Sequence, residues 1–304
     1  MGQRGSERIA GASRSLSMMA KPVSRSFAVL LRSLIFNALY FANLIVHMIA
    51  ALPTLVLPYP CVRVFIRSYS RTSLWLLRVV CNTSVEWRGV DKLPKGACIV
   101  ACKHQSAWET FALYAVLDDP AFILKRELMW IPLFGWHMWK AGLIPIDRGA
   151  GLAALTRMTT RARKALASSP PRQLVIFPEG TRRTPGAEPD YKPGVAYLYG
   201  KTGVPCVPVA LNSGVFWPRR SLYRFPGTIV VEILDPIAPS VVTPSLVTPS
   251  LVAPGLVTPS LVAPSLVAPN LAREAFFGRL QTVIETASAR LLQEAGSSAP
   301  SPDH

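Results

Sequence analysis

The sequence predicts an α/β fold in which a mixed central sheet is flanked by helices and preceded by an N-terminal membrane-anchoring helical segment. Two observations support this prediction. Short apolar runs alternate with helical segments between Val85 and about Leu234, as expected of a sheet that is covered on both faces. Ahead of them, the stretch from Leu34 to Leu57 contains no charged residue and is long enough to cross a bilayer.

Length and composition favour one catalytic domain at a membrane surface. The chain has 304 residues, of which 50% are hydrophobic, enough for one sizeable core. The net charge is +16, yet only 16% of the residues are charged. Anionic headgroups attract such a chain while its apolar segments insert. Nucleic acid is the rival partner for this charge, but no helix-turn-helix, zinc-finger or RNA-binding signature accompanies it.

The cysteines argue against a disulfide scaffold and against a metal site. There are five of them, an odd number, without paired spacing. We therefore expect buried free thiols, which suit a catalytic domain that faces the reducing cytoplasm.

The N-terminal part divides into two segments. Residues 1–25 are basic and rich in Gly and Ser, which is typical of a disordered tail. Residues 26–60 form the predicted membrane anchor. Because Asn37, Asn43 and His47 interrupt its apolar character, a single crossing, a half-inserted helix and a helical hairpin all stay open. Basic residues flank both ends, so the positive-inside rule selects no orientation.

Residues 61–239 form the predicted catalytic domain. Its strands are expected at residues 97–102, 142–146, 173–177, 204–211 and 228–234. Helices are expected at 107–117, 151–168 and 192–202.

A low-complexity array of six proline-containing pentapeptides occupies residues 240–269. Proline at every fifth position excludes a regular helix or a central strand, so an extended linker is predicted. A final amphipathic helix is expected over 270–295, with one apolar face made by Phe276, Leu280, Ile284 and Leu291. Residues 296–304 are predicted to be a disordered tail.

The first motif that carries chemistry is Lys103-His104-Gln105-Ser106-Ala107-Trp108-Glu109, directly after a predicted strand. A carboxylate five residues beyond a histidine can fix the tautomer of the ring and leave the other nitrogen to accept a proton from a hydroxyl. The alternative is structural, because Ser106 and Glu109 match a capping box. Cys102 is a rival nucleophile, since it shares a strand face with His104.

The second motif, Phe177-Pro178-Glu179-Gly180-Thr181-Arg182-Arg183, also follows a strand. Gly180 allows close backbone approach, Thr181 offers a hydroxyl, and Arg182 can hold a phosphate with two hydrogen bonds. The alternative is an ordinary Pro-Glu-Gly turn beside solvated arginines.

Two further elements complete the pattern. Ile144-Pro145-Ile146-Asp147-Arg148-Gly149 places Arg148 just beyond another strand, where it could share one phosphate with Arg182. The segment Val207-Pro208-Val209-Ala210-Leu211-Asn212 is expected to be a buried strand that shapes the pocket.

Taken in order, these four elements resemble the glycerolipid acyltransferase family, and in particular its bacterial members that acylate 1-acyl-glycerol-3-phosphate. The resemblance covers roughly residues 85–215, and the apolar N-terminal segment is similar to the family's membrane anchor. The family pattern usually has Asp five residues after the histidine, whereas this chain has Glu109.

The resemblance implies that His104 and Glu109 are catalytic, and that Arg148, Glu179, Gly180, Thr181 and Arg182 bind the acceptor. Glu179 would orient an arginine, and Lys103 would be solvated.

The implied reaction moves a fatty acyl group from acyl-CoA or acyl-carrier protein to lysophosphatidic acid, giving phosphatidic acid for phospholipid synthesis. No metal and no cofactor beyond the donor are expected. The implied location is the cytoplasmic face of the bacterial inner membrane. There are two alternatives. The acceptor is another lysolipid or glycerol-3-phosphate, or the chain is a non-catalytic lipid-binding protein.

Overall fold

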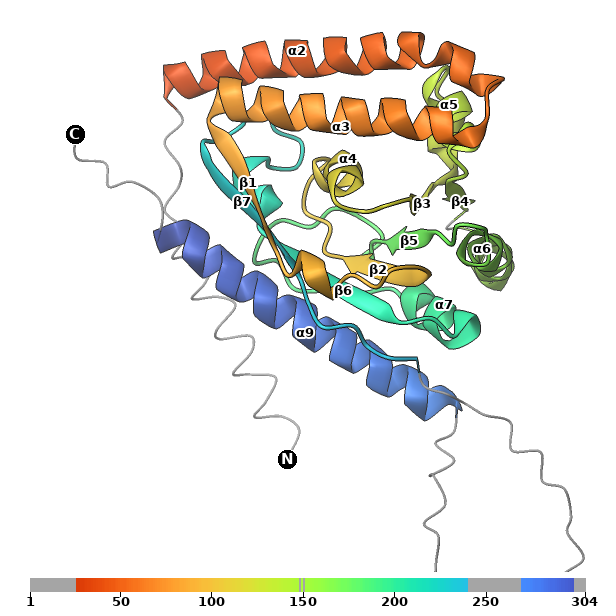
Figure 1. Cartoon of the computed structure of the whole chain (residues 1–304). Helices are drawn as coiled ribbons and strands as arrows, with labels where there is room; N and C mark the ends of the chain where they lie inside the picture. Colours follow the sequence, from red (N-terminus) through yellow and green to blue (C-terminus); the bar gives the residue numbers. More distant parts are fainter. Residues whose placement is uncertain (1–25, 148, 150, 240–268, 298–304) are drawn as a thin grey trace, which may run out of the picture.

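A seven-stranded sheet in the order β1-β7-β6-β2-β5-β3-β4 forms the centre of the computed structural model (Figure 1). The structure describes residues 26–147, 149, 151–239 and 269–297. The strands are β1 (Thr83–Arg88), β2 (Cys98–Cys102), β3 (Pro120–Lys125), β4 (Ile144–Ile146), β5 (Gln173–Ile176), β6 (Cys206–Leu211) and β7 (Gly227–Ile233). The α-helices are α2 (Phe27–Ala50), α3 (Tyr59–Cys81), α4 (Glu109–Ala112), α5 (Phe134–Lys140), α6 (Gly151–Leu166), α7 (Gly194–Thr202), α8 (Ser213–Phe216) and α9 (Pro269–Ser297). Short 3-10 helices are η1 (Leu52–Leu55), η2 (Val90–Lys92), η3 (Leu113–Ala115) and η4 (Arg126–Trp130).

The sheet is mixed, which confirms the predicted fold class. Strands β2 to β6 run parallel to one another, whereas β7 is antiparallel to β6 and parallel to β1. The carboxyl ends of β2, β4 and β5 therefore meet at one edge of the sheet. The first two chemical motifs start at the ends of β2 and β5, so the topology brings them together.

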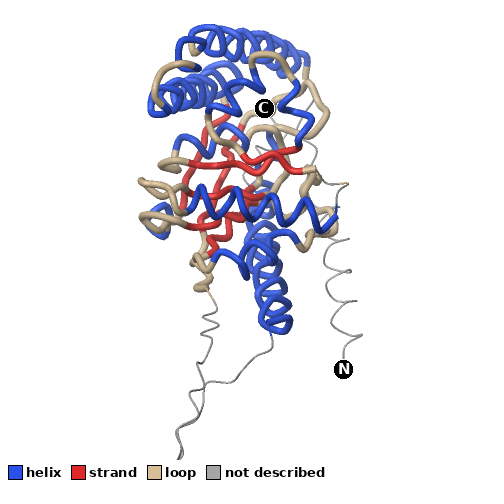
Figure 2. Tube along the Cα trace, turned by 90° about the vertical axis from the view of Figure 1, so that its right-hand side faces the viewer, coloured by secondary structure: helices blue, strands red, loops and turns tan. Residues whose placement is uncertain are grey.

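Different helices cover the two faces of the sheet (Figure 2). On one face, α3, α4 and η3 bury an aromatic-rich core that includes Trp108, Phe111 and Leu77. On the other face, α6, α7 and α9 bury a second core around Met158, Leu198 and Ile284. The predicted apolar face of the last helix is therefore confirmed, because Phe276, Leu280, Ile284 and Leu291 are all buried.

The apolar N-terminal segment is the first arm of a helical hairpin. Helix α2 lies along α3, and η1 joins the two helices (Figure 1). By length and composition α2 could cross a membrane, although only 17% of its apolar window is buried in the protein. The polar residues that interrupt α2 face protein: Asn37 donates to Leu222 O at 2.8 Å, and Asn43 donates to Ser73 Oγ at 3.0 Å.

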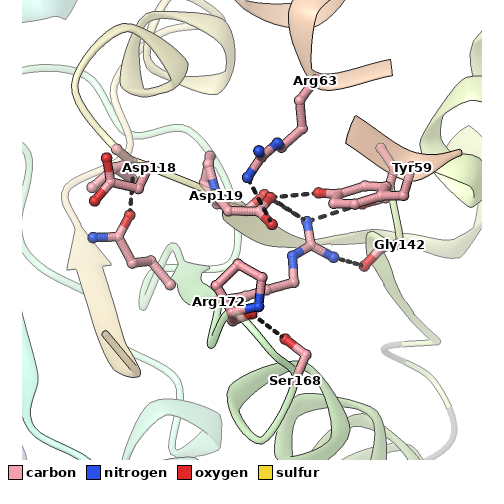
Figure 3. A network of polar contacts seen from close by, with 12 residues as sticks. Tyr59, Arg63, Asp118, Asp119, Gly142, Ser168 and Arg172 are labelled. Atoms are coloured by element: carbon pink, nitrogen blue, oxygen red, sulfur yellow. Dashed lines mark hydrogen bonds and ion pairs between the residues drawn. The ribbon is translucent and has the colours of Figure 1, made fainter. Parts of the chain in front are cut away.

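A buried ionic network joins α3 to the amino-terminal edge of the sheet (Figure 3). Asp119, just before β3, lies 3.2 Å from Arg172 Nη2 and 3.5 Å from Arg63 Nη1. The Tyr59 hydroxyl donates to the same carboxylate. Arg172 also donates to the carbonyl oxygens of Ala141 and Gly142. This edge is opposite to the one that carries His104, so the network belongs to the framework of the fold.

Candidate active site

His104 lies where β2 leaves the sheet. Strand β2 is completely buried, and the Lys103 amide still donates to Val209 O at 2.9 Å, so the chain turns away only at His104. The His104 side chain is 14% exposed. Its ring stacks on Phe177 with the centroids 4.0 Å apart and the planes 17° from parallel. The imidazole is therefore held in a fixed orientation while one edge stays accessible.

Glu109 lies beside the His104 ring and is completely buried. Its Oε1 is 3.6 Å from His104 Nδ1, which is too long for a direct hydrogen bond. The same oxygen accepts the amides of Gln105 at 2.6 Å and Ser106 at 2.8 Å. These donors compensate the buried carboxylate and hold it next to the ring. The structural and the chemical interpretations of Glu109 are thus compatible, because one oxygen caps the turn and faces the histidine.

The loop of the second motif is tied to His104 through the main chain. The Arg183 amide donates to His104 O at 2.8 Å, and the His104 amide donates to Glu179 Oε2 at 3.2 Å. Gly180 has φ +64° and closes a turn by donating to Phe177 O at 2.9 Å. A residue with a Cβ is strained at this φ, so the turn requires glycine. The first two motifs therefore form one site.

Glu179 and Lys103 form a buried ion pair, which corrects two expectations. Lys103 Nζ lies 2.9 Å from Glu179 Oε1, and both side chains are almost fully buried. Glu179 therefore faces a lysine rather than an arginine, and Lys103 is not solvated. Burial raises the pKa of the Glu179 carboxyl, and Lys103 opposes the rise.

The remaining predicted residues lie on the open side of the site. Thr181 is exposed and Arg182 is half-buried. Among the residues that the structure describes, nothing pairs with the Arg182 guanidinium, so it is available to an anion. Arg148 lies outside the described residues. It follows β4, whose carboxyl end is at the same edge of the sheet as that of β5, two strand spacings or about 10 Å away.

The sequence analysis missed three contributors to the site. Ser213 Oγ donates to Glu109 Oε2 at 3.3 Å, and the Gly214 amide donates to Gln105 Oε1 at 3.0 Å. Both residues lie at the start of α8, one residue beyond the end of β6, so the rule that sites gather at the carboxyl ends of strands would have found them. Arg219 donates to Arg182 O at 2.7 Å, and no local sequence signal marks it.

An apolar cavity of about 250 Å³ lies between the helical hairpin and the sheet. Phe177, the residue that stacks on His104, lines it, and so do Leu44, Met48, Phe65, Phe122 and Leu128. The cavity therefore starts beside the His104 ring and extends between apolar side chains.

Residues 84–212 match the family model described as acyltransferase. The match contains His104, Glu109 and the loop from Phe177 to Arg183, the residues that the structure brings together. Residues 84–212 form an acyltransferase-family domain. A second model, the GLTT repeat, matches residues 237–269 in six copies, the region of the pentapeptide array.

Relatives of the acyltransferase domain include proteins with one shared name. The chain is 36% identical over 171 residues to a 1-acyl-sn-glycerol-3-phosphate acyltransferase of Pseudomonas aeruginosa, covering 56% of this chain and 66% of the relative. It is 32% identical over 163 residues to the alpha form from Mus musculus, covering 52% and 56%. The chain thus spans between about half and two thirds of these relatives.

A solved structure shares the fold. The 1-acyl-sn-glycerophosphate (LPA) acyltransferase PlsC from Thermotoga maritima superposes with a TM-score of 0.63 at 19% identity, covering 86% of this chain and 96% of that one. The match covers more of the chain than residues 84–212, so the shared fold includes structure outside the acyltransferase domain.

Proposed function

We propose that this protein transfers a fatty acyl group from acyl-CoA or acyl-carrier protein to the sn-2 hydroxyl of 1-acyl-glycerol-3-phosphate, giving phosphatidic acid for phospholipid synthesis. The observation that carries the proposal is the joining of His104, with Glu109 at its Nδ1 side, to the loop that bears Arg182. A base for a hydroxyl and a cation for a phosphate then lie within one site. The names of the relatives support lysophosphatidic acid as acceptor.

The chemistry is one direct transfer. His104 Nε2 accepts the proton of the sn-2 hydroxyl while Glu109 stabilises the imidazolium that forms. The oxygen attacks the thioester carbonyl carbon, the C–S bond breaks, and the ester C–O bond forms. The leaving thiolate takes the proton from His104, so the ring returns to its neutral form. No covalent enzyme intermediate and no metal or cofactor are required by this sequence of steps.

The acceptor's phosphate is assigned to the loop after β5. Arg182 supplies the guanidinium, Thr181 a hydroxyl, and Gly180 allows the backbone to approach the ligand. Arg148, beyond the end of β4, supplies the second cation that a phosphate monoester calls for. Glu179 holds the His104 amide and Lys103 rather than the substrate.

The acyl chain of the donor is assigned to the apolar cavity between the hairpin and the sheet. Its lining begins at Phe177, in contact with the His104 ring, so a thioester carbonyl near His104 can extend its hydrocarbon tail inward. Burial of the tail supplies about 0.8 kcal/mol per methylene, which favours fatty over short acyl groups.

The helical hairpin and a tryptophan-rich surface are assigned to the bilayer, at the cytoplasmic face of the bacterial inner membrane. Helix α2 exposes a row of large apolar side chains, namely Leu31, Leu34, Ile35, Phe41, Ile45 and Ile49. Trp130, Trp136 and Trp139 are exposed on η4 and α5, next to η1 at the turn of the hairpin. Because α3 carries exposed Arg71 and Arg78, a hairpin that lies in the interface is favoured over one that crosses the hydrocarbon core.

An acceptor panel tests the proposal. The purified full-length chain in mixed vesicles is given one acyl-CoA and, in turn, lysophosphatidic acid, glycerol-3-phosphate, lysophosphatidylcholine and lysophosphatidylethanolamine. We expect kcat/KM to be at least about tenfold higher for lysophosphatidic acid, because only it combines a phosphate monoester with an apolar chain. Preference for another acceptor would reassign the substrate. No acylation of any acceptor would favour a non-catalytic lipid-binding protein.

A further inference from the structure

Helix α9 lies outside the acyltransferase-family domain, yet it packs on the same sheet. The family match ends at residue 212, and the pentapeptide array separates α9 from β7 along the chain. Nevertheless α9 runs along β6 and α7, and its buried face includes Phe276, Leu280 and Ile284 (Figure 1). Apolar burial explains why α9 binds to the sheet, but it does not explain a charge at its centre.

That charge is Glu285, which follows Ile284 and points toward the site. Glu285 Oε1 lies 2.6 Å from Lys103 Nζ, and it also accepts a hydrogen bond from the Tyr191 hydroxyl at 2.8 Å. The Lys103 ammonium lies 5.7 Å from the centre of the Tyr191 ring. Three segments that are far apart in the sequence, at residues 103, 191 and 285, therefore meet at one ammonium group.

Lys103 lies between two carboxylates. Its side chain is 3% exposed, and an ammonium at that depth is stable only when it is paired and hydrogen-bonded. Glu179 Oε1 is 2.9 Å from Lys103 Nζ, and Glu285 Oε1 makes the shorter contact, at 2.6 Å. Glu285 therefore contributes directly to holding the Lys103 side chain in place.

The cluster touches both loops of the site. Lys103 is the residue before His104, and Glu179 accepts the His104 amide. A change in the position of Lys103 or Glu179 therefore moves the backbone that carries the catalytic ring. Glu285 contacts neither the ring nor the open side of the site, so its effect must pass through these two residues.

We propose that Glu285 is a positioning residue for the acyl transfer. Helix α9 then contributes to catalysis although it lies beyond the pentapeptide array. Glu285 holds Lys103, and through Lys103 and Glu179 it fixes the backbone of His104. The inference rests on the proposed function for its kinetic consequence, but the geometry of the ring can be measured without turnover.

The kinetic test compares Glu285→Gln with Glu294→Gln in the full chain. Both substitutions change one carboxylate of α9 to an amide, but Glu294 pairs with Arg88 and Arg290, away from the site. For Glu285→Gln we expect kcat for lysophosphatidic acid to fall at least about tenfold, with KM changed less than about threefold, because Arg182 is outside the cluster. Glu294→Gln keeps kcat within about twofold of wild type. Tyr191→Phe, which removes one donor to Glu285 and keeps all charges, has an intermediate kcat.

The structural test records the ring signals of ¹⁵N-labelled histidine by NMR. The chain has four histidines, and His104→Gln identifies the signals of His104. We expect Glu285→Gln to shift the His104 signals and Glu294→Gln to leave them unchanged. Unshifted His104 signals in Glu285→Gln, or equal kinetic losses in both variants, would overturn the inference. An inactive wild type would contradict the proposed function alone, because the NMR comparison would still decide the role of Glu285.

Discussion

Among single residues, Glu109 combines backbone contacts with a position beside the ring that the proposed chemistry requires. Its Oε1 accepts two backbone amides, which holds the carboxylate in place next to His104 Nδ1. The two amides belong to Gln105 and Ser106, four and three positions earlier in the chain. The sequence offered a dyad and a capping box as alternatives. The structure shows the contacts to the backbone amides with the carboxylate beside the ring, and the dyad stays a prediction.

The alternative mechanism uses Cys102 as a nucleophile that accepts the acyl group. The environment of Cys102 argues against that role. The thiol is completely buried at the end of β2. Burial, with the nearby carboxylates of Glu109 and Glu179, raises the pKa of the Cys102 thiol well above its usual range. A thiol that stays protonated is a poor nucleophile.

We therefore expect Cys102→Ala to keep kcat within about threefold of wild type. The loss of the buried sulfur lowers the free energy of unfolding by about 1 kcal/mol, because a small cavity is left. Steady-state kinetics and urea unfolding measure the two effects. An acyl group trapped on Cys102, seen by mass spectrometry of the intact protein, would reverse this assignment.

Among the elements, the sequence predicted strands β2, β4, β5, β6 and β7, but it missed β1, β3 and the second arm of the hairpin. Strands β2, β5 and β6 are buried on both faces, so each is a continuous apolar run. Strand β1 lies at the edge of the sheet beside β7 and contains Glu86 and Arg88. It is therefore not a continuous apolar run, which was the pattern used to predict strands. Strand β3 was also missed.

The second arm of the hairpin was missed for a similar reason. Helix α3 carries exposed Arg71 and Arg78, so a search for an uncharged apolar stretch does not include it, and the hairpin extends to Cys81 rather than ending near residue 60. Long-range pairings cannot be predicted at all from local pattern. The hydrogen bond between Lys103 and Glu285 spans 182 residues of sequence.

We predict that removing Asp119 from the ionic network, at the amino-terminal ends of the strands, lowers the stability of the fold without a specific loss of catalysis. Asp119→Ala leaves the buried Arg172 without its carboxylate, which we expect to lower the free energy of unfolding by about 3–5 kcal/mol. The adjacent Asp118 is exposed, so Asp118→Ala is the matched control and changes stability by less than about 0.5 kcal/mol (Figure 3). Urea unfolding followed by circular dichroism measures both. Equal stability of the two variants would show that Asp119 contributes nothing.

At the scale of the whole molecule, the apolar surfaces of α2 and of the η4–α5 segment lie on the same side of the sheet as the cavity. If this side meets the bilayer, an acceptor and an acyl chain both reach His104 without leaving the lipid phase. The charge of +16 then strengthens attachment to anionic headgroups.

We predict that replacing Trp130, Trp136 and Trp139 together by serine weakens binding to vesicles of phosphatidylglycerol and phosphatidylethanolamine at least about tenfold. Leu152→Ser is the control, because Leu152 is 69% exposed on α6, which covers the other face of the sheet. Vesicle flotation measures binding. Equal flotation of the triple variant and wild type would exclude these tryptophans from the membrane contact.

The proposed role of His104, as the base for acyl transfer to a lipid hydroxyl, is tested by the turnover of His104→Ala with lysophosphatidic acid and an acyl-CoA in vesicles. We expect kcat to fall at least about a hundredfold. The variant remains folded by circular dichroism, and KM or binding of the acceptor changes little, because the Arg182 loop is intact. Turnover within about tenfold of wild type would exclude this role, since the proton of the hydroxyl would then leave by a route that does not use this ring.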